Sequence, residues 1–473
     1  MKQLVAFLTR STLLLFMTGC ATLAPEYQRP EAPVPASWPS GPAYPAVTAP
    51  TSKAVTDIPW REFFVDSRLR DLIALALSNN RDLRVSTLNI ERAQAQYQIR
   101  RADLFPRVDA SASGNFQRIP EDFSSKGQAT TVHQYSVGLG VSSYELDLFG
   151  RVASLKEQAL EQYLASEQAR TATHISLVAQ VATGWLTVAA DRERLQIARA
   201  TLKNQESYLG LIQSRHEAGI SSALELNQAR TLVESARLDV ARYTTLVAQD
   251  ENLLALLIGG AVPAGTLPDS LSDALTALKD LSPGVPSETL LKRPDILQAE
   301  QLLKAANANI GAARAAFFPK ITLVSSVGFG SNELAGLFTG GAFAWSFAPR
   351  ISLPIFDAGS NRAGLEVAEA DRKIAVAHYE KTIQTAFREV ADALAQRGTI
   401  EEQVTAQKAL TAATAESSSI SQARYEKGID SYLNVLDSQR SLYTAQQNLI
   451  SIRLARLTNL VTLYKALGGG WER

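Results

Sequence analysis

The sequence predicts a protein that combines very long α-helices with membrane-type β-strands and consists of two copies of one structural unit. Three observations support this fold class. Short landmarks recur in the same order about 210 residues apart, a register that chance similarity between helices would not keep. Each half contains two stretches in which apolar residues alternate with small or polar ones. Each half also contains a long proline-free stretch whose apolar residues have helical spacing.

Four pairs of landmarks define the repeat. They are Asn80-Arg81-Asp82-Leu83 with Arg293-Pro294-Asp295-Ile296, Arg101-Ala102-Asp103-Leu104-Phe105-Pro106-Arg107 with Arg314-Ala315-Ala316-Phe317-Phe318-Pro319-Lys320, Leu148-Phe149-Gly150 with Ile355-Phe356-Asp357-Ala358-Gly359, and His216-Glu217-Ala218-Gly219-Ile220 with Tyr425-Glu426-Lys427-Gly428-Ile429. We therefore predict a first repeat at 60–262 and a second repeat at 263–473.

The composition limits the possible functions. The chain has 473 residues, and its 47 Lys and Arg residues balance 47 Asp and Glu residues, so no strong field would draw it to nucleic acid. No apolar run after residue 20 reaches the roughly 18 residues of a membrane helix. The four histidines lack metal-ligand spacing, and neither a P-loop nor a nucleophile elbow is present. The sequence therefore predicts neither an enzyme nor a non-covalent cofactor.

The N-terminus has the layout of an exported lipoprotein. Residues 1–19 read as a signal peptide with a basic start and a short apolar run. The run ends in Met17-Thr18-Gly19-Cys20, which is similar to a lipobox. We expect Cys20 to become the first residue and to carry N-palmitoyl and S-diacylglycerol groups. Ala21 favours sorting to the outer membrane. Because Cys20 is the only cysteine, the chain forms no internal disulfide.

Residues 20–59 read as a tether. Nine of the nineteen prolines lie between Pro25 and Pro59, with Ser, Ala and Thr between them. Such a segment cannot form a packed core and is expected to be extended along the surface of the folded body.

Four strands are expected, at about 107–118, 133–146, 320–330 and 343–355. Each presents one apolar face and one face of small or polar residues, as in Phe343, Trp345 and Phe347 against Ala344 and Ser346. This is typical of a barrel with lipid outside and a wet lumen. Alternation alone also fits a soluble antiparallel sheet packed on one side.

A long helical hairpin is expected after each pair of strands. The first runs from Arg151 to about His216, turns near Gly219 and returns to Ile258; the second turns near Gly428. About 65 helical residues would span roughly 100 Å, so these helices must pack side by side in coiled-coil fashion. Glycine suits both turns because it readily adopts left-handed backbone geometry.

The number of strands in one chain predicts that several chains assemble. One chain supplies four strands, whereas about eight are needed to close the smallest barrel. Strand edges cannot stay unpaired in hydrocarbon, so several chains would share one barrel.

Further segments resemble a known family, the TolC-type outer-membrane efflux family, and within it the lipoprotein branch of OprM/NodT-like channels. The resemblance covers essentially the whole mature chain. It rests on the Cys20 start and on Tyr27-Gln28-Arg29-Pro30, Trp60-Arg61-Glu62-Phe63-Phe64, Tyr144-Glu145-Leu146-Asp147-Leu148-Phe149-Gly150-Arg151, Lys292-Arg293-Pro294-Asp295-Ile296 and Tyr464-Lys465-Ala466-Leu467-Gly468-Gly469-Gly470-Trp471.

The resemblance implies a homotrimer. Its twelve-stranded barrel would lie in the outer membrane and continue as a coiled-coil helical tunnel through the periplasm. The implied partners are a periplasmic membrane-fusion adaptor and an inner-membrane proton antiporter of the RND type. The channel itself would passively conduct antibiotics, solvents or other toxic small molecules.

The resemblance also implies a gate beside the second helix turn. Leu433 and Asp437 match positions that form rings at the periplasmic aperture, and Asp430 and Asn434 lie beside them. Tyr425 and Glu225 match positions whose hydrogen bonds tie neighbouring helices shut, and Glu426 is a third candidate for such a locking contact. Two departures stand out: Glu426 replaces a frequent arginine and Asn434 a frequent aspartate, so the same Arg–Asp lock is not expected.

Two other readings stay open. A lipid-anchored coiled-coil scaffold or adhesin would explain Cys20 and the helices but not the paired strands. A channel of the same fold could instead serve protein secretion driven by an ABC-type pump.

Overall fold

The computed structural model describes residues 22–44, 55, 58–124, 127–274, 277–279 and 287–470. The predicted signal peptide and Cys20 lie outside the described residues. In the first half, the helices and strands are α2 (Trp60–Phe63), α3 (Ser67–Asn79), α4 (Arg81–Ala102), β1 (Asp109–Ile119), η3 (Glu121–Phe123), β2 (Thr130–Leu146), α5 (Arg151–Glu217) and α6 (Ala223–Ile258). In the second half, they are α7 (Leu271–Ala274), η4 (Ser287–Lys292), α8 (Pro294–Ala315), β3 (Lys320–Ser331), η5 (Leu334–Gly336), β4 (Phe343–Ser352), α9 (Ser360–Glu426) and α10 (Tyr432–Ala466).

The described chain divides into two compact units. The first contains residues up to Glu31, Asn89–Ser166 and Gln298–Tyr379, and the second contains Ala32–Leu88, Glu167–Leu297 and the residues from Glu380 onward. Within the described ranges, no helix is both long enough and apolar enough to cross a membrane.

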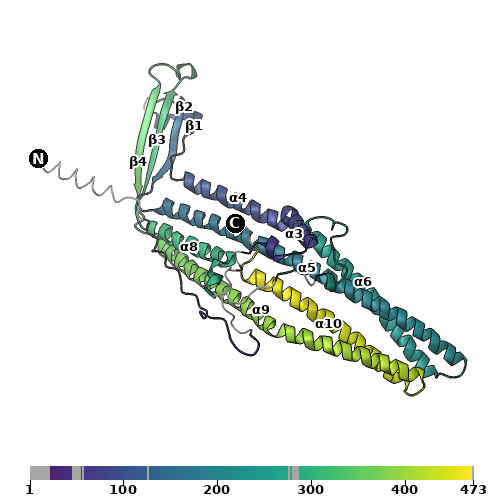
Figure 1. Ribbon diagram of the computed structural model, residues 1–473. Coiled ribbons are helices and arrows are strands. Elements are labelled where there is room, and N and C mark those ends of the chain that lie inside the picture. The colour runs from purple at the N-terminus through teal and green to yellow at the C-terminus, as the bar shows by residue number, and fades with distance from the viewer. Residues whose placement is uncertain are drawn as a thin grey trace. The chain divides into compact units, whose positions relative to one another are not determined.

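The first unit holds a four-stranded antiparallel sheet in the order β1-β2-β3-β4 (Figure 1). The strands begin and end within three residues of the bounds expected from the sequence. β4 ends at Ser352 rather than near 355, and Pro354 just beyond it has no N–H to donate to a ladder. Pro349 lies inside β4, which borders only β3 in this sheet, and proline is found in such edge strands.

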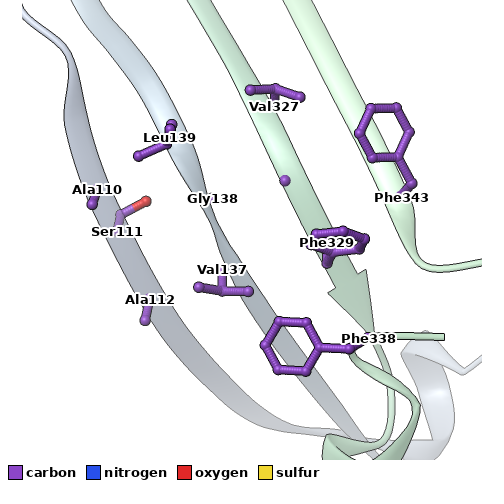
Figure 2. Close-up of a pocket in the computed structure, with 11 residues that line it drawn as sticks. Ala110, Ser111, Ala112, Val137, Gly138, Leu139, Val327, Phe329, Phe338 and Phe343 are labelled. Atoms are coloured by element: carbon purple, nitrogen blue, oxygen red, sulfur yellow. The ribbon is translucent and has the colours of Figure 1, made fainter.

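The strand registers sort the side chains into two faces of different character. Ala112 lies opposite Val137, Val137 opposite Phe329, and Phe329 opposite Phe343, which gives one apolar face. Figure 2 shows this face, with Phe338 from the β3–β4 connection beside Phe329. The two rings are 5.7 Å apart between centroids, and the hollow they border has a volume of about 530 Å³. The face is the one predicted to meet lipid.

The opposite face is lined by small and polar side chains. Ser113 and Ser136 lie 2.7 Å apart between hydroxyl oxygens, as do Ser326 and Ser346. Gly138 lies opposite Gly328, where a Cβ on Gly138 would lie 2.6 Å from the Val327 carbonyl oxygen. The backbones of β2 and β3 therefore approach too closely for any side chain at this point.

Glu145 holds the base of this sheet together. Its carboxylate accepts two hydrogen bonds from Arg151, at 2.7 and 2.6 Å, and forms an ion pair with Lys320 at 3.1 Å. The contacts join the end of β2 to the first residue of α5 and the first residue of β3. This bridge gives a structural reason for the charged residues in the Tyr144–Arg151 segment.

The described part of the tether lies along the first unit near its start. The Thr22 hydroxyl is 2.8 Å from that of Ser154, and Asn307 donates to the Pro25 carbonyl oxygen at 2.7 Å. Arg29 forms a two-pronged ion pair with the buried carboxylate of Glu300. The segment from Thr22 to Arg29 is thus fixed to α5 and α8 by side-chain contacts.

The second unit holds a small aromatic core and most of the long hairpins, namely α5 from Glu167, α9 from Glu380 and both return helices. Phe63 stacks on Tyr464 with ring centroids 4.0 Å apart, and the Tyr464 hydroxyl donates to the Ile58 carbonyl oxygen at 2.6 Å. Buried Arg293 donates to the Ala466 carbonyl oxygen at 2.7 Å and pairs with Asp295 and Glu389. A cation at the last turn of α10 is favourable because that helix end carries partial negative charge.

The two hairpins have nearly equal arms. α5 and α9 each contain 67 residues, and their return helices α6 and α10 contain 36 and 35. At 1.5 Å per residue, each long arm spans roughly 100 Å. The hairpins are cross-linked by side chains: Gln205 donates to Gln439 at 3.0 Å, and Tyr443 donates to Asp239 at 2.9 Å.

A pair of carboxyl groups lies between α5 and α6. Asp191 is buried and forms an ion pair with Arg194 at 2.6 Å, and Arg194 also donates to Ser451 of α10. One carboxylate oxygen of Asp250 is buried without a hydrogen-bond partner among the described residues. Burial and the neighbouring charge of Asp191 raise the pKa of Asp250 to about 6.

Replacing Asp250 by Asn should stabilise the second unit at pH 7.5 and have no effect near pH 4. Because the folded pKa lies above the ordinary value, the folded state holds the proton longer, and stability is lost as pH rises from about 4 to about 6. After discounting for partial exposure we expect a gain of about 1 kcal/mol at pH 7.5. Urea unfolding at both pH values measures this change in the free energy of unfolding. Exposed Glu234→Gln is the control, and an equal effect of Asp250→Asn at both pH values would contradict the assignment.

Candidate functional site

Both helix turns end in the same hydrogen-bonded motif. Gly219 and Gly428 have φ values of +75° and +73°. The amide of Ile220 donates to the Arg215 carbonyl oxygen and that of Ile429 to the Arg424 carbonyl oxygen, at 2.8 and 2.9 Å. This is the Schellman arrangement, which satisfies the last carbonyl groups of a helix. No atom lies within 4 Å of a Cβ built on either glycine, so the backbone conformation and not the space requires glycine here.

Glu225 is used within its own helix. Its carboxylate accepts a hydrogen bond from the Ser222 amide at 3.1 Å, while the Ser222 hydroxyl accepts one from the Glu225 amide at 3.2 Å. This capping box supplies partners for two amides at the start of α6. The predicted bond from Glu225 to a neighbouring helix stays a prediction, and in this chain it would compete with the cap.

Asp430 is paired across the second turn. Its carboxylate accepts two hydrogen bonds from Arg424, at 2.6 and 3.2 Å. The guanidinium holds the pKa of Asp430 below its ordinary value. The ion pair closes the loop between α9 and α10.

Tyr425 belongs to a buried cluster that joins the tips of the hairpins. Tyr208 from α5 stacks on Tyr432 from α10 at 5.3 Å between centroids, and Tyr425 lies 5.5 Å from Tyr432. Arg215 lies over the Tyr425 ring at 5.3 Å. Burial raises the pKa of Tyr432 and Tyr208 well above the ordinary value, so both hydroxyls stay protonated. The cluster is completed by Ile212, Leu226, Ala229, Val435 and Leu436.

Leu433, Asn434 and Asp437 lie on the opposite face of α10 from this cluster. Leu433 is 53% exposed, which is high for a leucine beside a packed core. Asp437 lies four residues later on the same helix face, and its carboxylate is 3.9 Å from Arg440. These three of the four predicted gate side chains are therefore exposed and do not belong to the core, whereas the fourth, Asp430, is paired with Arg424.

Glu426 borders a polar groove between α5, α9 and α10. The groove has a volume of about 610 Å³ and is lined by polar side chains including Asn204, Gln439 and Tyr443. Gln422 donates to the Glu426 carboxylate at 3.2 Å within α9. This local bond does not tie helices together, so the predicted locking role of Glu426 also stays a prediction.

Comparison with known proteins identifies the family. The model of the outer membrane efflux protein family matches residues 72–260 and 285–469. The chain belongs to this family, as the resemblance predicted. It is thus an outer membrane protein, with homologues that serve efflux pumps.

The similarity to named members of the family extends over nearly the whole chain. The antibiotic efflux pump outer membrane protein ArpC of Pseudomonas putida and the toluene efflux pump outer membrane protein TtgC of the same species are each 51% identical, over 98% of this chain and 96% of theirs. The open state of the Neisseria gonorrhoeae MtrE outer membrane channel has a TM-score of 0.83 at 39% identity, covering 95% of this chain and 98% of that one. The helical hairpins and the four-stranded sheet are the elements of this chain that resemble that channel.

The sequence predicts both turns, and the residues it selects as gate candidates at 433, 434 and 437 are exposed, but it does not reveal the contacts that support the turns. Tyr208, Tyr432 and Arg424 were not singled out. The Ser222-x-x-Glu225 spacing is the signal that could have revealed the cap. No comparable sequence signal marks the tyrosine cluster, because its members come from different helices. Within the described residues, no group of three His, Cys, Asp or Glu side chains could hold a metal ion.

Tyr432→Ala should loosen the hairpin tips, whereas Tyr432→Phe should not. Alanine leaves a cavity beside Tyr208 and Tyr425, and such truncations cost about 3–5 kcal/mol. The Tyr432 hydroxyl is buried without a partner among the described residues, so its removal should be neutral or slightly stabilising. Hydrogen exchange of the amides around residues 425–436 measures the difference. Equal protection in both variants would show that the ring does not support the tip.

Proposed function

We propose that the protein is the outer-membrane exit duct of a tripartite RND-type efflux pump. It would passively conduct antibiotics, organic solvents or other toxic small molecules from the periplasm to the outside. The observation that carries the proposal is the combination of a two-faced, four-stranded sheet with relatives about half identical over 98% of the chain and named for toluene and antibiotic efflux.

The assembly that fits this function is a homotrimer. Three copies of the four-stranded sheet would supply a twelve-stranded barrel, which removes the open edges of β1 and β4. The apolar face would meet lipid and the face of glycine and serine would line the lumen. The helical hairpins of the three copies would form the coiled-coil tunnel below it.

An internal two-fold repeat would give six quasi-equivalent units per trimer. The order of two strands, a 67-residue helix and a shorter return helix occurs at β1–α6 and again at β3–α10. The two segments that match the family model fall within the proposed repeats at 60–262 and 263–473. Both observations support the repeat that the sequence landmarks predict.

The proposed partners follow from the same role. An adaptor of the membrane-fusion type and an RND proton antiporter would dock from the periplasmic side, since a passive duct needs an external energy source. Cys20, with its N-palmitoyl and S-diacylglycerol groups, would anchor the chain in outer-membrane lipid after removal of residues 1–19. The proposed duct requires no catalytic residues, no other cofactor and no nucleic acid.

The gate would lie at the second helix turn. In a trimer, three copies of Leu433 and of Asp437 would face one another, with Asn434 and the Arg424–Asp430 pair beside them. A leucine ring excludes water, while a carboxylate ring attracts cations and opposes closing by like-charge repulsion. The exposure of Leu433 and Asp437 supports this role, because neither side chain is committed to the core.

Producing the chain together with an adaptor and RND exporter should restore efflux in a strain that lacks its own duct. We expect at least about a tenfold rise in the inhibitory concentrations of exported antibiotics and survival of toluene exposure. A strain with the same outer-membrane level of the chain and an inactive exporter is the control. Unchanged susceptibility would contradict the RND assignment. If the chain instead supports export of a protein into the medium when it is produced with an ABC-type pump, the secretion alternative would be favoured.

Asp437→Ala should lower the preference for cations in planar bilayers, by about twofold or more at 0.1 M salt. The effect should shrink at 1 M salt, where the screening length is only about 3 Å. Asp437→Glu keeps the charge and is the matched control. If single-channel currents of the alanine variant equal those of the unaltered protein at both salt concentrations, Asp437 does not line the aperture.

A further inference from the structure

The hollow on the apolar face of the sheet has small side chains on one side and aromatic rings on the other. Ala110 and Ala112 of β1 line it on one side, and Phe329, Phe338 and Phe343 border it on the other (Figure 2). Its volume of about 530 Å³ lies within the roughly 300–1,000 Å³ range of ligand sites. Phe338 is 73% exposed, so its ring keeps apolar surface that no described residue covers.

The hollow lies toward the outer end of the strands. α4, α5, α8 and α9 join the strands at one end of the sheet, and the β1–β2 and β3–β4 connections form the other end. In the proposed barrel these connections face the outside. β1 has 11 residues, and a tilted strand of about 9–11 residues crosses the hydrocarbon core. The last residues of β1 would therefore reach the outer interface of the membrane.

Aromatic rings continue from the hollow toward this interface. Phe116 lies opposite His133, and Gly114 lies opposite Tyr135. The Phe116 ring is 5.4 Å from the His133 ring and 5.5 Å from the Tyr135 ring between centroids. A Cβ built on Gly114 would lie 3.3 Å from the Phe116 ring, so this ring lies back over the glycine. Aromatic side chains at this level are typical of membrane interfaces.

A single cation follows these rings on the same face. Arg118 is two residues beyond Phe116 and lies opposite Thr131, and it is the only Lys or Arg on the apolar face of the four strands. Its side chain is exposed and forms no ion pair with another described residue, including Glu121 and Asp122 of the β1–β2 connection. An arginine on a lipid-facing surface costs little free energy only near the interface, where its head group reaches water and lipid phosphates.

We propose that this face binds one phosphorylated lipid of the outer leaflet, of the lipid A class, with an acyl chain in the hollow and a phosphate on Arg118. The proposal rests on the proposed barrel, which turns this face toward lipid. The planar guanidinium group matches phosphate oxygens in pairs, which favours a phosphate over other parts of a lipid head group.

The spacing of the two parts fits one leaflet. Arg118 and Ala112 are six residues apart on β1, which is about 20 Å at 3.4 Å per residue. A strand tilt of about 45° converts this to about 14 Å of depth, close to half of the roughly 30 Å hydrocarbon core. A lipid with its phosphate at Arg118 therefore places its acyl chain along Phe116 and in the hollow.

The charges on this face favour an anionic lipid. The four strands present no Asp or Glu on the apolar face, so no carboxylate there repels a phosphate. A zwitterionic phospholipid carries a second, positive charge that Arg118 repels. A free phosphate ion would meet Arg118 alone and would leave the apolar hollow uncovered.

Native mass spectrometry of the full-length trimer in detergent, stripped of lipid and then titrated with lipid A, measures the binding. Arg118→Ala should raise the lipid A concentration for half occupancy about tenfold or more, because a charge-assisted hydrogen bond is lost. Arg118→Lys should recover part of this loss. Arg350→Ala is the matched control, since Arg350 lies on the opposite face of β4 and its loss should leave lipid A binding unchanged.

The hollow is tested by a separate pair of variants. Phe338→Ala removes an exposed ring from the border of the hollow and should weaken lipid A binding about fivefold or more. Phe123→Ala is its control. Phe123 is an equally exposed ring in the β1–β2 connection and does not line the hollow, so its removal should have no effect. Neither ring is part of a buried core, so both variants are expected to fold.

The outcomes separate the lipid site from the proposed function. Equal lipid A binding by Arg118→Ala and Arg350→Ala would overturn the phosphate contact, and equal binding by Phe338→Ala and Phe123→Ala would overturn the acyl contact. Competition by phosphatidylglycerol as strong as that by lipid A would overturn the assignment to an outer-leaflet lipid. Full competition by excess inorganic phosphate would show an ion site only. A conducting trimer that binds no lipid A overturns this inference alone, whereas absence of any trimer or conductance in the unaltered protein overturns the proposed function.

Discussion

Backbone amide and carbonyl groups cannot remain unpaired in hydrocarbon, and most of this structure can be understood from that constraint. A sheet of four strands satisfies its inner ladders and leaves two open edges. The alternation of apolar and small residues sets which face can meet lipid. The order of two strands, a long helix and a return helix occurs twice, and in the proposed trimer the open edges of β1 and β4 would pair between copies. The helical hairpins, by contrast, satisfy their backbone groups internally and can extend far into water.

The charges near the helix turns are largely neutralised by local partners. Glu225 caps its own helix, and Asp430 is held by Arg424 across a six-residue separation. Tyrosine rings rather than ion pairs join the hairpins at their tips. Leu433 and Asp437 are left exposed on the other face of α10. The residues that support the turn are buried or held by close hydrogen bonds, whereas Leu433 and Asp437 are exposed, and the only ion pair of Asp437 among the described residues is the long one to Arg440 at 3.9 Å.

Periodicity and glycine placement were enough to predict the strands, the long helices and both turns, because these depend on neighbours close in sequence. Gly219 and Gly428 are examples, since the left-handed backbone conformation requires that residue type. Contacts between distant segments could not be derived in this way. Tyr208 meets Tyr432 only after two hairpins have packed, and the clash of a Cβ at Gly138 with the Val327 carbonyl depends on strand register. The capping box could have been predicted from the sequence alone. Asp437 and Leu433 were selected by resemblance to a family, because a charged residue on a helix surface carries no signature of its own.

The facing glycines of β2 and β3 have a consequence for transport selectivity. Where Gly138 meets Gly328, the wall is bare backbone, and the serines beside it are occupied by one another. A wall of this kind offers few side chains that could bind a passing solute by stacking or by ion pairing. In the proposed barrel, solutes of very different chemistry would meet the same smooth surface and similar drag. Discrimination among cargoes would then be left to the partners upstream, and one duct could serve pumps of differing preference.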